Sequence, residues 1–304
     1  CQTMTSPTFA VIIPTLNRPG HLRKCLESIA KQTLRPTQII LVDQSDDTHS
    51  KTLFEEFALN GVIKTYLHQE IKSLILARNF GLNHVRDCEF SGFLDDDLEL
   101  FPDFFEKLLA PFQNDPEFKL AAGMGTPVGE TRKSDIFAQF FLQQHYGNGK
   151  FMPHGLPTFP YGLEHFTEVE FVAGGATLYR NEIIQKYRFD ERLIGYGYGD
   201  DIDVSFRISR KYKNFFEPKA RYKHDIGSPG RDPGFKFRKQ QIQNFYYLLR
   251  KNVGLTPKSI SAFSWYCFGQ LLDDSRNLRR SALKGCLAGI INVARGRLDS
   301  VRSD

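Results

Sequence analysis

The sequence predicts an α/β fold, in which a mixed, mainly parallel sheet is flanked by helices and followed by a C-terminal helical extension. Continuous apolar runs are typical of strands buried on both faces, and they occupy residues 9–14, 38–43, 61–67 and 90–94. Segments with apolar residues at helical spacing follow these runs, at residues 19–31, 48–59, 73–85 and 102–112. Strands that alternate with helices indicate a parallel sheet covered on both faces.

Polar residues follow three of the four runs, at the point where each predicted strand ends. They occupy residues 14–18, 43–47 and 95–97. In parallel sheets, ligands bind beyond the carboxyl ends of the strands. The sequence therefore predicts a binding site at this edge of the sheet.

The pattern weakens after residue 122 and returns later. Between residues 123 and 162, glycine, proline and aromatic residues are frequent, and only 134–145 has helical spacing. Residues 168–172 predict a strand and 200–212 predict a helix. From residue 231 onward the pattern is helical, with breaks near 254–257 and 273–275.

Composition narrows the class of protein. The chain has 304 residues, 25% of them charged, and a net charge of +5. This charge is too mild for a general nucleic-acid surface, so no nucleic-acid partner is expected. The five cysteines are scattered and form no Cys-x-x-Cys pair, which predicts neither a zinc site nor a disulfide framework and favours a cytoplasmic location. No apolar run reaches the roughly 18 residues of a membrane span.

Three consecutive carboxylates, Asp95, Asp96 and Asp97, directly follow the fourth predicted strand. Like charges this close repel each other unless a cation compensates them. A divalent ion held between carboxylate and phosphate oxygens is one such cation. The alternative is a solvated turn that leads to the helix at Pro102, although the run precedes that helix by several residues.

These segments together resemble the ordered motifs of family 2 glycosyltransferases, which have the GT-A (Rossmann-like) fold. The resemblance rests on residues 11–18 (VIIPTLNR), 40–45 (ILVDQS), 77–81 (ARNFG) and 93–97 (FLDDD) and covers roughly residues 8–230. It implies a metal-dependent, inverting transfer of a sugar from a nucleoside diphosphate to an acceptor hydroxyl. It also implies a catalytic domain over residues 1–230, with a nucleotide-binding half (about 8–115) and an acceptor-binding half (about 116–230). The helical extension would then be 231–304.

By this resemblance, Asp95 and Asp97 form an Asp-x-Asp pair. Asp95 would lie near the ribose and the metal, and Asp97 would ligate Mn²⁺ or Mg²⁺. Asp96 is assigned to the donor site as the intervening residue, with a bystander role as the alternative. His224 resembles the third metal contact of the family, since a neutral imidazole can complete a manganese coordination sphere; otherwise it is an ordinary polar residue.

The donor pocket is assigned in the same way. Asp43 corresponds to the family residue that accepts a hydrogen bond from the pyrimidine ring, which favours UDP or dTDP as the nucleotide. Arg78 is predicted to contact phosphate or stack on the base, with a surface salt bridge as the alternative. The remaining residues assigned to this pocket are Pro14, Thr15, Arg18 and Asn79. No Gly-x-Gly-x-x-Gly turn follows the first strand, which argues against a dinucleotide-binding dehydrogenase.

An inverting transfer needs a carboxylate that takes the proton from the acceptor hydroxyl. The family commonly has Glu-Asp before a helix at this point, and this sequence has Asp200-Asp201. Asp201 is therefore the predicted base and Asp200 its competitor, with helix capping as the alternative role for both. Gly174 and Gly175 resemble the family's small-residue loop near the transferred sugar.

The C-terminal extension is basic. Residues 276–302 contain seven basic residues and one acidic residue, Asp299, among apolar residues at roughly helical spacing. Such a helix either contacts an anionic membrane face peripherally or packs on the catalytic domain with a solvated basic side. The acceptor is expected to be a saccharide or a lipid-linked saccharide, in bacterial surface polysaccharide or O-antigen synthesis, and the overall resemblance suggests a rhamnosyltransferase-like role.

Two alternatives remain at this point. A nucleotidyltransferase shares the sheet and the acidic metal site, but would carry a Gly- and Lys/Arg-rich phosphate loop after the first strand, where only Arg18 fits. A non-catalytic carbohydrate- or metal-binding module would need the acidic clusters, but not Asp43 and Arg78 near successive strand ends.

Overall fold

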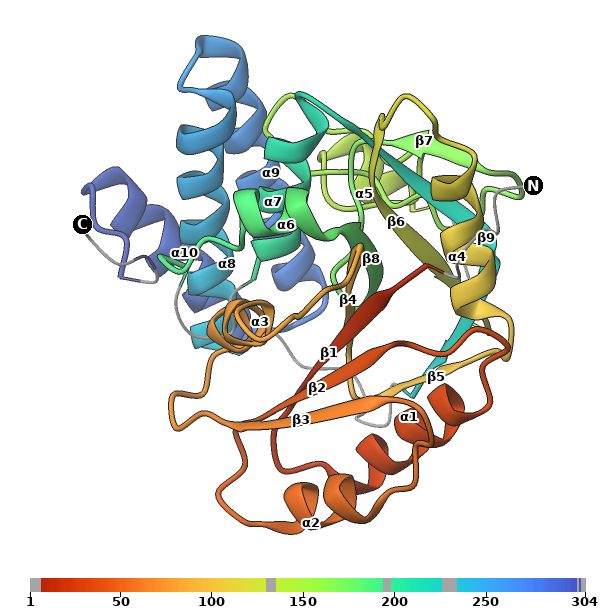
Figure 1. Ribbon diagram of the computed structural model, residues 1–304. Helices are drawn as coiled ribbons and strands as arrows, with labels where there is room; N and C mark the ends of the chain where they lie inside the picture. Colours follow the sequence, from red (N-terminus) through yellow and green to blue (C-terminus); the bar gives the residue numbers. More distant parts are fainter. Residues whose placement is uncertain (1–6, 130–134, 194–197, 226–233, 300, 302–304) are drawn as a thin grey trace.

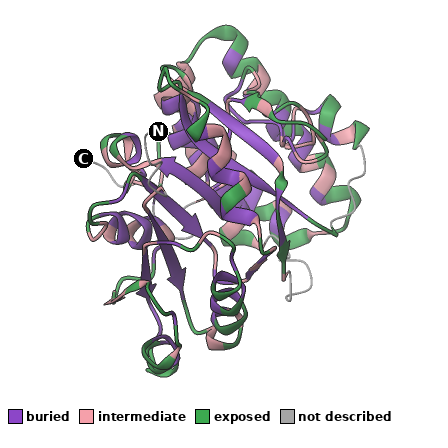
Figure 2. Cartoon of the chain, turned by 45° about the vertical axis from the view of Figure 1, so that its right-hand side comes forward, coloured by how far each residue is buried: buried purple, intermediate pink, exposed green. Residues whose placement is uncertain are grey.

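The computed structural model describes residues 7–129, 135–193, 198–225, 234–299 and 301. Its centre is one nine-stranded sheet with the strand order β3-β2-β1-β4-β8-β6-β9-β5, and β7 pairs with β9 (Figure 1). The strands along the middle of the sheet are buried (Figure 2). The predicted fold, a mixed sheet flanked by helices, is confirmed.

The first four strands form the parallel part of the sheet. They are β1 (Phe9–Thr15), β2 (Gln38–Asp43), β3 (Ile63–His68) and β4 (Phe90–Leu94), and β1 lies between β2 and β4. The intervening helices are α1 (Pro19–Ala30), α2 (His49–Glu56) and α3 (Leu74–Leu82). Each lies where the sequence predicts it, within a few residues at the ends.

The second half of the sheet is more complex than the sequence predicts. Its strands are β5 (Leu98–Leu100), β6 (Leu120–Pro127), β7 (Thr167–Val169), β8 (Ala176–Arg180) and β9 (Lys213–His224). The β4–β8, β6–β8, β5–β9 and β7–β9 pairs are antiparallel, and β6–β9 is parallel. A Cβ at Gly123 would lie 2.2 Å from the ring of Phe215, so β6 needs a small residue where a strand pattern normally shows a large one.

Two hydrophobic cores cover the sheet, one on each face. One joins α1, α2 and α4 (Phe104–Gln113) to the sheet. The other joins α3, α6 (Asn181–Tyr187) and α7 (Asp200–Ser209) to the C-terminal helices. The short helix α5 (Ile136–Phe140) lies within residues 134–145, the stretch with helical spacing, and is shorter than that pattern predicts.

The C-terminal segment is helical, as predicted. It contains α8 (Phe235–Leu248), the π-helical turn η1 (Leu249–Val253), α9 (Pro257–Arg276) and α10 (Arg280–Ala294). The break near 254–257 is confirmed, and the break predicted near 273–275 lies slightly later, at residues 277–279 between α9 and α10. Asp274 is fully buried and ion-paired with Arg238 of α8 at 2.7 Å, so this acidic position stabilises the helix instead of ending it. Among the described residues, no helix is long and apolar enough to cross a membrane.

The extension also holds α7 in place. Asp203, on α7, is fully buried; its carboxylate is ion-paired with Arg207 and with Lys251, each at 2.7 Å, and accepts a hydrogen bond from Asn252 at 3.1 Å. Lys251 and Asn252 belong to η1, so this turn anchors the helix on which Asp200 and Asp201 lie.

We expect Lys251→Met to lower the free energy of unfolding by about 1–3 kcal/mol, because the buried carboxylate of Asp203 loses a cationic partner. Thermal or urea unfolding measures the effect. The matched control is Lys236→Met, at an exposed lysine on α8, which is expected to change stability by less than about 0.5 kcal/mol. Equal stability of the two variants would contradict the anchoring role of η1.

Candidate active site

A cleft of about 340 Å³ lies beyond the carboxyl end of β4, beside the start of β8 and the start of α7. Three groups of predicted site residues line it: Asp95, Arg78 with the two glycines, and Asp200 with Asp201. His224, at the end of β9, lines it too. The structure thus brings together residues that are up to about 150 positions apart in the sequence, counting from Arg78 to His224.

Arg78 is the centre of the cleft floor. Its side chain is 3% exposed, and its guanidinium donates to Asp200 Oδ2 at 2.6 Å, to Asp95 Oδ1 at 3.2 Å and to the carbonyl of Gly174 at 3.1 Å. Burial alone would lower its pKa, but the carboxylates of Asp200, Asp95 and Asp201 raise it, so the group stays charged. The alternative of a surface salt bridge is wrong, because Arg78 is a buried link between the two acidic clusters.

Gly174 and Gly175 lie directly against two charged side chains of the cleft. A Cβ at Gly174 would lie 2.6 Å from Arg78 Nη1, and a Cβ at Gly175 would lie 2.6 Å from Asp95 Oδ2. The absent side chains therefore leave room for the Arg78 and Asp95 side chains themselves.

We expect Gly175→Ala to displace the Asp95 carboxylate, which would lower activity and cost about 1–3 kcal/mol of stability, as overpacking usually does. The control is Gly20→Ala, because a Cβ there meets nothing within 4 Å and alanine is the better helix former. Unfolding curves and turnover of both variants test this, and a fully active Gly175→Ala variant would contradict the argument.

Asp200 and Asp201 differ sharply in environment. Asp200 is buried and its carboxylate is neutralised by Arg78. Asp201 is only partly buried, and its oxygens accept from the backbone N–H groups of Gly174 at 3.3 Å and Ile202 at 2.8 Å. Burial and the neighbouring Asp200 charge raise the pKa of Asp201 to about 7. Neither carboxylate occupies the N-cap position of α7, which Gly199 takes with a φ of 103°.

The other members of the acidic run face different surroundings. Asp97 Oδ2 accepts from Arg18 Nη1 at 2.9 Å, and Asp97 Oδ1 lies 3.6 Å from His224 Nε2. Asp96 is fully buried, accepts from Thr15 Oγ1 at 2.6 Å and is ion-paired with Arg18 Nη2 at 2.5 Å. Burial raises the pKa of Asp96 to about 7, while the Thr15 hydrogen bond and Arg18 oppose the rise. Asp96 is therefore an internal anchor for β1 and Arg18.

The donors near Asp97 suit a divalent cation. Asp97 Oδ1 is buried and accepts no hydrogen bond within the described part of the chain, so this carboxylate oxygen has a lone pair to offer. His224 and Asp95, both lining the cleft, add an imidazole and a second carboxylate. As the side chains stand, no group of three His, Cys, Asp or Glu residues among the described ones already has the spacing of a metal site.

Two residues of the donor pocket that are assigned to the nucleotide base, Asp43 and Pro14, are buried in the protein. Asp43 is fully buried and accepts from the Ser45 N–H at 2.9 Å and the Tyr66 hydroxyl at 3.1 Å. Pro14 is also buried, at the end of β1. The carboxylate of Asp43 keeps lone pairs for another donor. Because Asp43 is fully buried, the base of a nucleotide would reach it only if neighbouring groups moved aside.

Asn79 corrects one prediction. Its amide donates to the Phe189 carbonyl at 3.0 Å and to Glu191 at 2.8 Å, and its oxygen accepts from the Phe189 N–H at 3.1 Å. Asn79 is 3% exposed and holds the segment after α6. With its polar atoms engaged inside the protein, it is not placed to bind a ligand in the cleft.

Sequence reasoning missed an aromatic wall of the cleft. Phe159 and Tyr161 stack with ring centroids 5.8 Å apart and line the cleft from the irregular segment before β7. Tyr198 lines it from the other side and donates to Gln144 at 2.9 Å. The high aromatic content of residues 140–166 was the available signal, but nothing in its spacing showed which rings face the cleft.

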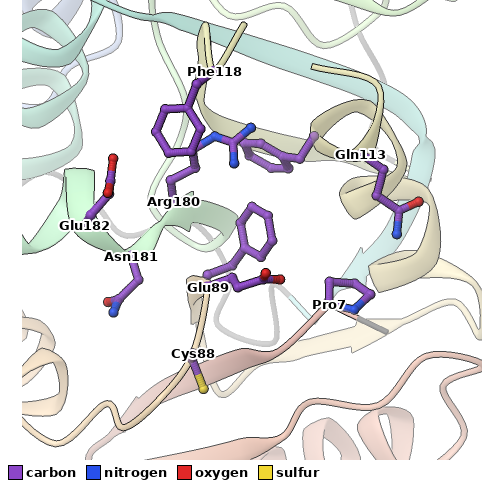
Figure 3. Close-up of a pocket in the computed structure, with 10 residues that line it drawn as sticks. Pro7, Cys88, Glu89, Gln113, Phe118, Arg180, Asn181 and Glu182 are labelled. Atoms are coloured by element: carbon purple, nitrogen blue, oxygen red, sulfur yellow. The ribbon is translucent and has the colours of Figure 1, made fainter. Parts of the chain in front are cut away.

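A second hollow, of about 500 Å³, lies away from this chemistry, at the opposite end of β4 and β8 (Figure 3). Its Arg180 donates to the Leu120 carbonyl at 2.8 Å and pairs with Asp115 at 3.1 Å, and its guanidinium carbon lies 3.8 Å from the centre of the Phe118 ring. These contacts link β8 to the segment that follows α4, so Arg180 stabilises the fold there.

Comparison with known proteins decides the family. The sequence model of "Glycosyl transferase family 2" matches residues 10–188, more than half of the chain. The chain belongs to glycosyl transferase family 2. The matched part includes β1 to α6 and thus Asp43, Arg78 and the Asp95–Asp97 run, while α7 and the C-terminal helices lie outside it.

Relatives with similar sequences include bacterial proteins that are named as glycosyltransferases. The chain is 30% identical over 148 residues to EpsH of Bacillus subtilis (strain 168), named as a candidate glycosyltransferase, covering 47% of this chain and 42% of EpsH. It is 25% identical over 187 residues to the glycosyltransferase GlyA of Streptococcus pneumoniae serotype 4, covering 62% of this chain and 26% of GlyA. The match thus spans less than half the length of either relative.

Solved structures share the fold. One is the mannosyltransferase PcManGT of Pyrobaculum calidifontis in complex with GDP-Man and Mn²⁺, with a TM-score of 0.59, 15% identity and coverage of 98% of this chain and 78% of that one. Another is GalNAc-T7 with UDP, GalNAc and Mn²⁺, with a TM-score of 0.61, 18% identity and coverage of 97% and 59%. These are GT-A glycosyltransferases, and the GT-A fold is thereby confirmed.

Proposed function

We propose that this family member is a metal-dependent, inverting glycosyltransferase that moves a sugar from UDP or dTDP to an acceptor hydroxyl. The observation that carries the proposal is the cleft itself. Arg78 joins the carboxylates of Asp95 and Asp200, and Asp201 faces the same cleft with a raised pKa. One wall thus offers groups for a diphosphate and a cation, and the other offers a proton acceptor.

Asp201 is the proposed base. A carboxylate with a pKa near 7 is well matched to proton transfer at neutral pH. The two backbone N–H groups that reach it fix its orientation. Asp200, held by Arg78, is already neutralised by a cation and is the weaker acceptor. In an inverting reaction, Asp201 removes the proton from the acceptor hydroxyl as that oxygen attacks the anomeric carbon and the nucleoside diphosphate leaves.

We place the divalent cation, Mn²⁺ or Mg²⁺, at Asp97, His224 and Asp95. When bound, such a cation neutralises the charge that develops on the departing diphosphate. Arg18 holds Asp97 by one carboxylate oxygen and leaves the other toward His224. Both of the solved structures compared above contain Mn²⁺, which supports a cation in this protein.

The proposals for the nucleotide and for the acceptor each rest on a few residues. A carboxylate at Asp43 suits the ring N–H of uracil or thymine, and we propose that Thr15, Pro14 and Arg18 form the rest of this side. The stacked Phe159 and Tyr161 are proposed to face the acceptor, because aromatic faces pack well on sugar rings.

The named relatives EpsH and GlyA are bacterial, which supports a role in bacterial surface polysaccharide synthesis. The boundary at residue 230, the rhamnosyltransferase-like role and the cytoplasmic location stay predictions.

A donor survey tests the proposal. Purified protein with Mn²⁺ is incubated with UDP-, dTDP- and GDP-sugars, and the released nucleoside diphosphate is measured, since glycosyltransferases hydrolyse their donors slowly without an acceptor. We expect release from UDP- or dTDP-sugars, dependence on the cation, and a β-configured first product from an α-linked donor by NMR. Release from GDP-sugars alone would contradict the role of Asp43, and retained configuration would contradict an inverting reaction.

A further inference from the structure

An exposed apolar face forms where α5 packs on α9. Its large exposed side chains are Ile136 (78% exposed), Phe140 (63%), Trp265 (38%), Phe268 (47%) and Leu272 (38%). The two helices are joined directly, because the Trp265 indole N–H donates to the Phe140 carbonyl at 2.7 Å and the two rings lie 5.3 Å apart. We call these five residues the α5–α9 face.

The outward side of α9 carries no charge over almost its whole length. Residues 259–272 include no Asp, Glu, Lys or Arg. The residues between the exposed apolar ones, Ser261 and Ser264, are exposed and small. A helix side turned to water usually carries charged residues, and contiguous exposed apolar surface of this kind marks an interaction site.

Positive charge borders this face. Lys258 lies at the start of α9 and Arg276 at its end, where the Arg276 guanidinium lies 5.6 Å from the ring of Phe137 on α5. Two acidic residues of this region are ion-paired, Asp273 with Arg279 at 3.0 Å and Asp274 with Arg238 at 2.7 Å. Asp135 caps α5 and keeps an exposed negative charge. The rim therefore offers a partner more positive than negative charge.

We propose that the α5–α9 face docks on the surface of an anionic lipid bilayer. Tryptophan and phenylalanine side chains partition into the boundary between headgroups and acyl chains, and a basic rim adds attraction to anionic headgroups. This assigns membrane contact to the uncharged face of α9 and α5, whereas the sequence offered the basic segment around α10 as one of two alternatives.

The position of this face relates it to the cleft. Phe141 packs against Trp265 and Phe268, with ring centroids 5.0 and 5.9 Å away, and Gln144, three residues on, lines the cleft and binds Tyr198. A bilayer on the α5–α9 face would thus lie near the wall of the cleft that we assign to the acceptor. This consequence rests on the proposed function, but docking itself does not.

Trp265 is the only tryptophan of the chain, so its fluorescence reports on this face directly. The full chain is titrated with vesicles of phosphatidylcholine alone and of phosphatidylcholine with phosphatidylglycerol. We expect a blue shift of emission with the anionic vesicles, quenching by brominated acyl chains, and a much weaker response to the neutral ones. Absence of the shift and of the quenching would overturn the proposal, whether or not the chain transfers sugar.

Substitutions locate the contact. Phe268→Ser is expected to weaken binding to anionic vesicles about tenfold or more, because one large side chain no longer enters the boundary. The control is Ile71→Ser, at a residue that is 58% exposed after β3 and is expected to bind like wild type. Thermal unfolding shows that the variants are folded. The assignment would be overturned if Lys284→Gln on α10 abolished binding and Phe268→Ser left it intact. It would also be overturned if the fluorescence shift grew with protein concentration in the absence of vesicles, because that would indicate that a second copy of the chain covers this face.

Discussion

Replacing Asp97 by asparagine is expected to reduce transfer by about 10³-fold or more, because the loss of several kcal/mol of charge stabilisation at the leaving group corresponds to that factor. Asparagine keeps the size and one oxygen of the side chain but removes the charge that a divalent cation needs. The donor survey gives the rates, and they are measured at several Mn²⁺ concentrations.

The control for Asp97→Asn is Asp46→Asn. Asp46 is an exposed carboxylate after β2 that pairs with Lys72 at 2.6 Å, and exposed ion pairs contribute little to stability. Asp46→Asn should keep wild-type activity and wild-type cation dependence. An active Asp97→Asn variant with unchanged dependence on Mn²⁺ would contradict the assignment of Asp97 to the cation.

The second large effect is expected at the base. Asp201→Asn should slow transfer by about 10²–10⁴-fold, the usual contribution of general acid–base catalysis, while the affinity for the nucleotide stays close to wild type. The wild-type rate should rise with pH through about 7, because only the deprotonated Asp201 carboxylate accepts the proton and its pKa is raised to about 7 by burial and by Asp200. The measurement is a pH–rate profile for both proteins.

Asp200→Asn separates the two neighbouring carboxylates. Because Asp200 accepts a 2.6 Å hydrogen bond from buried Arg78, its loss leaves a buried cation with less compensation, and about 3–5 kcal/mol of stability should be lost. Asp201→Asn should unfold near the wild-type temperature. If Asp201→Asn instead keeps its activity and only Asp200→Asn is inactive at a temperature where it is folded, Asp200 is the base.

The sequence was informative where structure is local. The strands at 9–15, 38–43 and 90–94 and their helices could be predicted because buried parallel strands read as continuous apolar runs, and the acidic cluster was visible as neighbours in the chain. The pairing of Asp203 with Arg207 was predictable for the same reason, since residues four apart on a helix are neighbours.

What the sequence could not show depends on contacts between distant segments. The sequence assigned Asp96 to the donor site, or to a bystander role, because its partners Thr15 and Arg18 are about 80 positions away in the chain. Asn79 looked like a pocket residue because it follows Arg78, yet one step along a helix turns a side chain by about 100°, and Asn79 faces Phe189 instead. The strand β6 was missed because two of its residues are glycines, Gly123 and Gly125, which the rings of Phe215 and Phe104 require and which hide the strand pattern.

A calorimetric titration of nucleotides tests the proposed function most directly. UDP and dTDP are titrated into the wild-type protein and into Asp97→Asn, each with and without Mn²⁺, and NAD serves as the unrelated ligand. The proposal predicts binding of a pyrimidine diphosphate that requires Mn²⁺, that is lost in Asp97→Asn, and that NAD does not reproduce. Failure of both nucleotides to bind the wild-type protein with Mn²⁺ would contradict the donor site built from Asp43, Asp95, Asp97 and His224.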